Sequence, residues 1–510
     1  MSENKRFAIN IIAQMFAFVV NLGIGFFLTP YIVKHVGKEA FGFFGLALNF
    51  VSYAQLITIA LNSMAARYIT ISISQNDILT ANKYFTSVFY ANIVFAVILS
   101  IVFLFLIIYL NELINIPPRI DTDVKLLFSF IFLNFIISIV TSVYGVAAFA
   151  KNRLDLSSLR SIISNIIKIG TIVFCFAYFS PNVWYIGFAS VLTSIYLYYT
   201  NFRLTIKLLP ELKIAKKYID LQKIKELIKS GIWNTLSKLS GILNVGLDLL
   251  IANLFIGAAA MGTLSLAKTI PGIILSIFAV LASVYAPNLT KSFALGKNNE
   301  IKEQLLSSMK FMGFISSIPI AILFAYGDVF FKLWVPGVDY RLIHILSIFT
   351  SLELCFALPQ EGLWNIFTIT NKVKVTSLNL FLMSFLTICT VFIAMNVVEI
   401  NHRIYYLGGI TSLFGIVRLL TFLPIYGAKC LDLKWNTFYP ILIKNFISII
   451  VLTIVSLVIK QIINPISWYT LAIVIILTTA IGFGINNYLI LNKRERKFLL
   501  DVTMEKVLKR

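Results

Sequence analysis

The stretch Gly37-Lys-Glu-Ala-Phe-Gly42-Phe-Phe-Gly-Leu-Ala47 returns 220 residues later as Gly257-Ala-Ala-Ala-Met-Gly262-Thr-Leu-Ser-Leu-Ala267. Both copies keep two glycines five residues apart and end on the same Leu-Ala pair. The same offset places residues 125–150 on 345–370 and the basic loop 151–153 on 371–374. Weak internal symmetry at one fixed offset is typical of membrane proteins that consist of two related halves. The sequence therefore predicts two structurally similar halves.

Long apolar runs surround both copies. The chain of 510 residues is 59% hydrophobic and only 13% charged, which a soluble globular protein does not tolerate. A helix needs about 20 apolar residues to cross a bilayer. We therefore predict an all-α polytopic membrane protein with about fourteen transmembrane helices. They are expected at 7–33, 41–64, 85–110, 125–150, 157–179, 184–206, 230–257, 263–288, 305–327, 338–369, 376–398, 404–428, 438–460 and 467–491.

The positive charges give the orientation of these helices. Most of the 43 Lys and Arg fall in the two tails and in every second connection. Positive connections stay in the cytoplasm during insertion, so both termini are predicted to be cytoplasmic. The net charge of +21 is explained by this asymmetry and requires no nucleic acid as a partner.

The repeat divides the chain into four predicted parts. An N-terminal lobe of six helices spans residues 1–206, and a C-terminal lobe of six spans 230–428. Because six is an even number, both lobes enter the membrane from the same side. Residues 207–229 form a basic cytoplasmic linker, and 429–510 hold two extra helices and a basic tail.

The linker carries a second pattern. Ile214, Tyr218, Leu221, Ile224 and Ile228 recur at helical spacing with lysines between them. This pattern predicts an amphipathic helix on the inner leaflet, where anionic lipids would be its partners. A plain basic linker that only enforces the topology is the alternative.

Several short motifs resemble one family of transporters, the polysaccharide or oligosaccharidyl-lipid flippases of the multidrug/oligosaccharidyl-lipid/polysaccharide exporter superfamily. They are Leu28-Thr-Pro30-Tyr31, Gly37-x4-Gly42, Ala66-Arg67-Tyr68, Asp248-x8-Gly257-x4-Gly262 and Ala286-Pro287-Asn288-Leu289. The resemblance implies a flippase that moves undecaprenyl-linked oligosaccharides or cell-surface polymer precursors from the inner to the outer leaflet by alternating access. It also implies a bacterial inner or plasma membrane, and glycosyltransferases or a polymerase of the same pathway as partners. The pathways implied by this resemblance are the synthesis of the cell wall, teichoic acid, O-antigen and capsule.

Charged side chains inside the predicted helices point to a substrate site. An ionised side chain at mid-bilayer costs roughly 2.5–3.5 kcal/mol, so several of them must be paired, hydrated or used. Lys168, Lys238 and Arg418 are expected to meet the pyrophosphate of a polyprenyl-linked saccharide, since Lys and Arg make charge-assisted hydrogen bonds to phosphate. Interhelical ion pairs with buried acids are the alternative. Polar side chains expected to line the same cavity between the lobes are Gln14, Asn21, Asn62 and Asn234.

Arg67 matches a motif of the family and is predicted to hold a gate or to reach the membrane surface. Asp248, Glu353 and Glu361 are alternative positions for coupling to H⁺ or Na⁺, because burial raises the pKa of a carboxylate. The membrane potential alone would also drive a pyrophosphate outward. No cofactor and no metal site are predicted, and the four scattered Cys have no ligand spacing.

Two other functions compete with the flippase. A multidrug exporter of the same superfamily would use acidic residues to attract cationic drugs. A membrane glycosyltransferase or polymerase would need catalytic acids outside the membrane, for which only Asp121 and Asp123 qualify. Since no nucleotide-binding glycine motif or metal-ligand cluster appears, we predict that the chain is not an enzyme.

Overall fold

The computed structural model describes residues 3–492, apart from 152, 286–288, 291, 294 and 371, together with residue 496. Over these residues the chain is helical with short connections and no strand, which confirms the all-α prediction. The motif Ala286-Pro287-Asn288 and nearly all of the predicted basic tail 493–510 lie outside the described residues. The chain separates into two compact units, Met1–Ser265 and Leu266–Arg510, and each is considered by itself.

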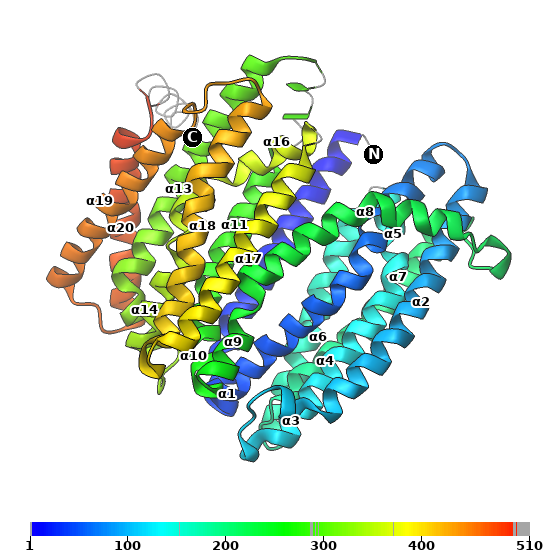
Figure 1. The fold of residues 1–510 in the computed structure, drawn as a ribbon, viewed down its shortest axis with the longest axis horizontal. Helices are drawn as coiled ribbons and strands as arrows, with labels where there is room; N and C mark the ends of the chain where they lie inside the picture. The colour runs from blue at the N-terminus through cyan, green and yellow to red at the C-terminus, as the bar shows by residue number, and fades with distance from the viewer. Residues whose placement is uncertain are drawn as a thin grey trace. The chain divides into compact units, whose positions relative to one another are not determined.

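Figure 1 shows the helices of the first unit running side by side. They are α1 (Glu3–Ser74), α2 (Ile78–Ile108), α3 (Leu110–Leu113), α4 (Asp121–Thr141), α5 (Val146–Ala150), α6 (Leu154–Tyr178), α7 (Trp184–Leu208), α8 (Leu221–Gly241), α9 (Asp248–Phe255) and α10 (Ala258–Ala267), whose end crosses the boundary. Short 3₁₀ turns are η1 (Pro118–Ile120), η2 (Ser142–Gly145) and η3 (Lys216–Tyr218), and η4 (Ile242–Gly246) is a π-helical turn.

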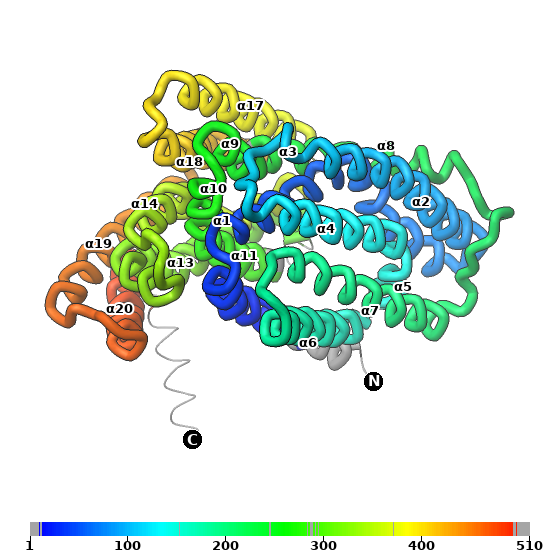
Figure 2. The backbone as a smooth tube through the Cα atoms, turned by 90° about the horizontal axis from the view of Figure 1, so that it is seen from below, coloured from blue at the N-terminus to red at the C-terminus, as the bar shows by residue number. Residues whose placement is uncertain are grey.

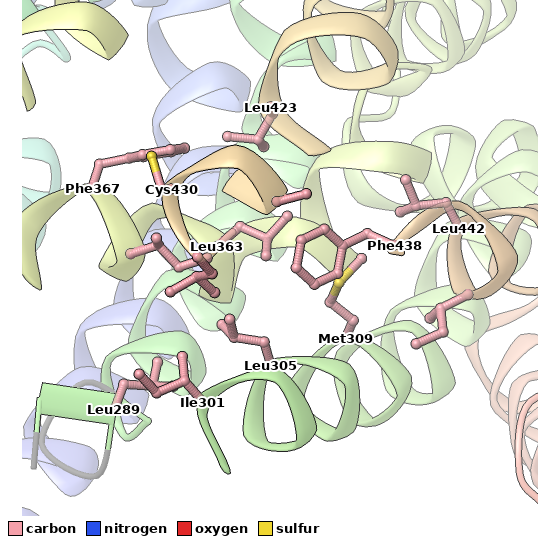
Figure 3. Packing of buried hydrophobic residues seen from close by; sticks show 14 of the residues in the cluster. Leu289, Ile301, Leu305, Met309, Leu363, Phe367, Leu423, Cys430, Phe438 and Leu442 are labelled. Atoms are coloured by element: carbon pink, nitrogen blue, oxygen red, sulfur yellow. The ribbon is translucent and has the colours of Figure 1, made fainter. Parts of the chain in front are cut away.

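The second unit contains α11 (Thr269–Ser283), α13 (Asn298–Trp334), α14 (Tyr340–Ser351), α15 (Leu354–Gln360), η5 (Glu361–Leu363), α16 (Trp364–Ile369), α17 (Val373–Val397), α18 (Ile400–Cys430), α19 (Tyr439–Ile463) and α20 (Trp468–Leu489). A hydrophobic cluster of this unit joins α13, η5, α16, α18 and α19. Figure 3 shows Leu305, Met309 and Phe438 turned toward one another in this cluster.

Each of the fourteen predicted apolar stretches coincides with helix, and α1 contains the first two of them. Ten of the described helices are long and apolar enough to cross a membrane, or eleven when α14 and the segment Leu354–Ile369 count as one bent span. The remaining helical stretches are shorter or more polar. The chain is therefore a multi-pass membrane protein.

The predicted offset of 220 residues recurs in the breaks between helices. Gly37 and Gly257 both have positive φ, at 83° and 129°, and so do Asn76 and Gly296, at 59° and 68°. Each member of the second pair lies two residues before a long helix, α2 or α13. The 3₁₀ turns η2 and η5 interrupt corresponding stretches. Gly37 and Gly257 both lie in the first unit, whereas each of the other two pairs has one member in each unit. All three pairs agree with the predicted internal repeat.

The two glycine motifs also touch each other within the first unit. A Cβ atom added at Gly42 would lie 2.8 Å from the Cα of Gly262, and one added at Gly262 would lie 2.3 Å from the carbonyl oxygen of Lys38. Only glycine permits this approach of two backbones, which is the usual way that helices pack in a membrane. The motif that marks the repeat thus forms a helix crossing between α1 and α10.

The predicted linker helix is formed only in its second half, from Leu221 onward, where it is the start of α8, and the loop in its first half has a local cause. Helix α7 ends at Leu208, before Pro210, and residues 209–220 contain only the 3₁₀ turn η3. Asn82 of α2 holds this loop, because its amide donates to the carbonyl of Glu211 at 3.1 Å and accepts from the backbone N–H of Lys213 at 2.6 Å. A new helix begins only after Asp220, which caps α8. The division into lobes at 1–206, 230–428 and 429–510 remains a prediction.

We expect Gly262→Ala to lower the free energy of unfolding by about 1–3 kcal/mol, because the new methyl group would overlap the backbone at Lys38. Thermal unfolding in detergent measures the effect. Gly170→Ala is the matched control, since nothing lies within 4 Å of its Cβ position in α6. Equal melting temperatures for the two variants would show that the glycine crossing is loosely packed.

Asp220 is expected to contribute stability that depends on pH. The ammonium of Lys83, 3.2 Å away, and the backbone N–H groups of Gln222 and Lys223 lower the pKa of this carboxyl group. A lowered pKa stabilises the folded state above the unfolded value of about 3.9, and this contribution is lost as the pH falls through the folded value. Asp220→Asn keeps a good helix cap but not the charge. Its melting temperature should lie below that of the wild type at pH 7, and the gap should narrow as the pH falls below about 4; a constant gap would contradict the charge argument.

Candidate functional site

Lys168 lies where α6 packs against α1. One turn before it, the side-chain amide of Asn165 donates to Asn21 of α1. The Lys168 ammonium lies 5.7 Å from the centre of the Phe44 ring, and within the described part of the chain it forms no ion pair. The structure thus brings Lys168 and Asn21 into one neighbourhood. Gln14 is exposed, two turns before Asn21 on the same helix.

Asn62 is part of a closed hydrogen-bond network. Its amide donates to Asn92 of α2 at 3.0 Å, and Asn92 donates back at 2.9 Å and also to the Ser142 hydroxyl at 3.1 Å. Asn92 is fully buried. Because unsatisfied amides are costly in a membrane, this network joins α1, α2 and η2. A substrate would have to replace these bonds to reach Asn62.

Asn234 and Lys238 follow one another on α8, which packs along α1 so closely that a Cβ atom at Gly231 would lie 1.9 Å from the carbonyl oxygen of Ala60. The amide of Asn234 donates to the Ser63 hydroxyl at 3.0 Å. Lys238 is partly buried one turn later, and Arg67 is exposed one turn after Ser63. These side chains form a polar strip along the pair α1–α8.

The strip ends at a break in the seventh predicted span. Residues 242–246 form the π turn η4, so the even spacing of 100° per residue that would align Lys238 with Asp248 does not continue through it. The Tyr53 hydroxyl donates to the carbonyl of Gly246 at 2.7 Å and fixes this turn to α1. Asp248 follows at the start of α9 with only 4% of its surface exposed, and its charge acts on Tyr53.

Arg418 lies in the second unit among two acids and one ring. Glu353 and Glu361 act electrostatically on its guanidinium group, which lies 5.7 Å from the centre of the Trp364 ring. A Cβ atom at Gly415 would lie 1.9 Å from Oε2 of Glu353, so glycine makes room for this carboxylate one turn before Arg418. Breaks at Leu352 and at η5 bring both acids toward α18.

The predicted residues therefore fall into two groups. Gln14, Asn21, Asn62, Arg67, Lys168, Asn234, Lys238 and Asp248 belong to the first unit, and Glu353, Glu361 and Arg418 to the second. Arg418 has the acidic neighbours that the ion-pair alternative requires, whereas Lys168 has a ring. Four further residues of these neighbourhoods were not predicted from the sequence: Asn92, Asn165, Phe44 and Trp364. An Asn within an apolar run was the available signal for the first two.

The competing catalytic pair has a structural explanation. Asp121 and Asp123 lie in the first turn of α4, where negative charge is favourable, and Asp121 pairs with Lys125 at 3.0 Å. Among the residues that the structure describes, no cluster of three His, Cys, Asp or Glu side chains could hold a metal ion. The four Cys are all free thiols.

Comparisons with known proteins agree with this picture. Residues 7–293 match the family described as "Polysaccharide biosynthesis protein". The "Uncharacterized membrane protein EpsK" of Bacillus subtilis (strain 168) is 25% identical over 496 residues, which cover 97% of each chain.

Two solved structures share the fold. One is titled "Lipid II flippase MurJ, inward closed conformation", with a TM-score of 0.63 and 15% identity over 93% of this chain and 98% of that one. The other is an inward-facing multidrug resistance MATE family transporter of the MOP superfamily, with a TM-score of 0.64 and 12% identity over 83% of this chain and 98% of that one. At these identities the likeness shows that the fold is shared.

The cluster around Arg418 predicts non-additive mutations. Arg418→Met should lower the free energy of unfolding by about 2 kcal/mol, because it leaves two half-buried carboxylates without their cation. Adding Glu353→Gln to that variant should cost less than the single Glu353→Gln costs in the wild type. Unfolding titrations of the four proteins in SDS complete this double-mutant cycle. Strictly additive losses would mean that the two side chains do not interact.

Proposed function

The chain belongs to the polysaccharide biosynthesis protein family, and from this we propose that it is a flippase for a polyprenyl-linked saccharide. It would carry an undecaprenyl-linked oligosaccharide or cell-surface polymer precursor from the inner to the outer leaflet of a bacterial cell membrane by alternating access. Its termini would lie in the cytoplasm, as the distribution of Lys and Arg favours. The glycosyltransferases or the polymerase of the same pathway would be its partners.

The observation that supports the proposal is that two lysines of the first unit lie within helices without a carboxylate partner among the described residues. Lys168 and Lys238 lie within helices, and neither has a carboxylate partner in the described part of the chain. A cation that is costly in the membrane and has no protein counterion is suited to an anionic cargo. A pyrophosphate offers several oxygens for charge-assisted hydrogen bonds. Arg418, in the second unit, is the third predicted phosphate contact and would exchange a carboxylate for phosphate.

Amides on the same helices would contact the sugar. Asn21 and Gln14 are exposed on α1 and Asn234 is partly buried on α8, and each can donate and accept hydrogen bonds. Asn62 would act indirectly, by holding α1 against α2. Arg67 would hold the gate, one turn beyond Ser63.

Two sources of energy are compatible with this arrangement. A cargo with about two negative charges gains about 2.3 kcal/mol per charge when it moves outward across 100 mV. Asp248, Glu353 and Glu361 would instead couple transport to H⁺ or Na⁺. Glu353 and Glu361 already neutralise Arg418, which favours the membrane potential as the drive.

We expect native mass spectrometry of the gently purified protein to detect a bound polyprenyl-(pyro)phosphate saccharide. The variant Lys168→Ala/Lys238→Ala/Arg418→Ala should lose most of it, since each lost charge-assisted contact weakens binding by roughly tenfold. The mass of the bound lipid would also identify the sugar.

A variant with the same change of charge is the control for this measurement. Lys429→Ala/Lys434→Ala/Lys444→Ala removes three exposed cations and should retain the lipid. Equal retention by both variants would contradict the cationic site. Absence of the lipid together with stabilisation by cationic drugs would favour a multidrug exporter.

Transport in vesicles is expected to respond to the membrane potential and not to Na⁺. Glu353→Gln and Glu361→Gln should each leave the Na⁺ and pH dependence of transport unchanged, because these acids already neutralise Arg418. Asp248→Asn should also leave it unchanged, because the potential alone drives the cargo. Transport is measured with a fluorescent polyprenyl pyrophosphate under an imposed potential. Loss of a Na⁺ or pH response in one variant would identify that acid as the coupling site.

A further inference from the structure

A small basic pocket lies apart from all these residues, between the first turns of α6 and the last turns of α7. Figure 2 shows the two helices side by side. The pocket has a volume of about 250 Å³. Four of its seven lining residues are cations, and the lining consists of Arg153, Leu156, Arg160, Arg203, Leu204, Lys207 and Leu208.

Only one of these four cations is neutralised. Arg153 forms a two-point contact with Asp155, at 3.0 and 3.1 Å. Arg160 donates to the carbonyl of Leu156 at 3.3 Å, and the Arg203 guanidinium lies 4.5 Å from the centre of the Tyr199 ring. Within the described residues, Arg160, Arg203 and Lys207 contact no carboxylate. Three positive charges therefore face one small cavity without a counterion from the protein.

The positions of these cations along the two helices differ. Lys207 lies in the last turn of α7, where the negative end of the helix dipole favours a cation. Arg153 precedes the first turn of α6, where Asp155 already offsets its charge. Arg160 lies about two turns into α6, beyond the reach of the helix dipole, and it has no carboxylate partner within the described residues. The uncompensated charge of the pocket therefore comes from Arg160, Arg203 and Lys207.

Apolar side chains extend the pocket toward the middle of both helices. Ile163 lies about one turn beyond Arg160 on α6, and Tyr199 and Ile195 lie one and two turns from Arg203 on α7; all three are exposed. A ligand with a charged head and an apolar tail fits such a surface better than a free ion. Basic pockets between membrane helices are known to hold anionic lipid head groups.

We propose that this pocket binds the phosphate of an anionic glycerophospholipid from the leaflet that meets these helix ends. The phosphate lies among Arg160, Arg203 and Lys207, and the acyl chains follow Ile163 and Ile195. The lipid would tie the start of α6 to the end of α7. This site uses none of the residues assigned to the saccharide carrier.

Binding of phosphatidylglycerol and phosphatidylcholine to the full chain tests the proposal, with native mass spectrometry as the readout. The wild type should retain phosphatidylglycerol in preference. Arg160→Gln/Arg203→Gln/Lys207→Gln should weaken its binding by about tenfold or more, since charge-assisted contacts to phosphate are lost. Lys213→Gln/Lys216→Gln/Lys217→Gln removes the same charge from an exposed loop nearby and should change binding by less than about twofold.

Each other outcome overturns a part of the idea. Equal losses in both triple variants would mean general attraction and no pocket. Displacement of the lipid by millimolar inorganic phosphate would mean a site for free phosphate. Loss of a polyprenyl pyrophosphate and not of phosphatidylglycerol would make the pocket a substrate site. If the triple variant does not fold, Lys207→Gln alone, which changes an exposed side chain, should still weaken binding about threefold, and unchanged binding would reject the proposal.

Discussion

The close approach of two backbones at Gly42 and Gly262 fixes the distance between α1 and α10 in the first unit. Helices in a bilayer gain no hydrophobic energy from meeting each other, because lipid is as apolar as their side chains. They associate through close packing, and glycine allows the closest. The same two motifs contain the Lys38 carbonyl that Gly262 approaches and the positive-φ glycines Gly37 and Gly257. The repeated motif therefore provides both the change of backbone direction and the close contact between α1 and α10.

Buried polar groups provide the second means of association in both units. Asn62, Asn92 and Ser142 join three elements of the first unit. In the second unit the Asn486 amide donates to Ser317 of α13 at 2.7 Å, and the Lys460 ammonium reaches Asp328 at 2.5 Å. Such groups hold a helix in one register, since a shift by one residue would leave them unsatisfied in a medium without water. The rigid framework that results can hold uncompensated cations elsewhere.

The charged residues do not follow the repeat, although the fold does. At the offset of 220, Lys168 corresponds to Ile388 and Glu353 to Leu133. The shared positions are glycines, turns and helix starts, which determine backbone geometry. The departures are cations in one unit and a compensated Arg–Glu cluster in the other. A duplicated scaffold with different charges can present an asymmetric surface to an asymmetric, charged cargo.

The sequence by itself determined the helices, the membrane, the repeat and the family, because apolar runs and glycine spacings are local signals that survive without knowledge of contacts. It also identified the deep charges, since their cost depends only on depth. The tertiary structure decided which groups these side chains contact. Asn62 is hydrogen-bonded to Asn92, Arg418 lies beside two acids, and Lys168 lies near an aromatic ring. The π turn η4 also interrupts the helical face on which Lys238 and Asp248 were predicted to align. The tertiary structure also showed that the first half of the predicted linker helix is a loop held by Asn82. It brought Arg160 and Arg203, which are 43 positions apart, to one pocket. Contacts between residues that are distant along the chain produce no periodic pattern in the sequence, so only the folded structure shows them.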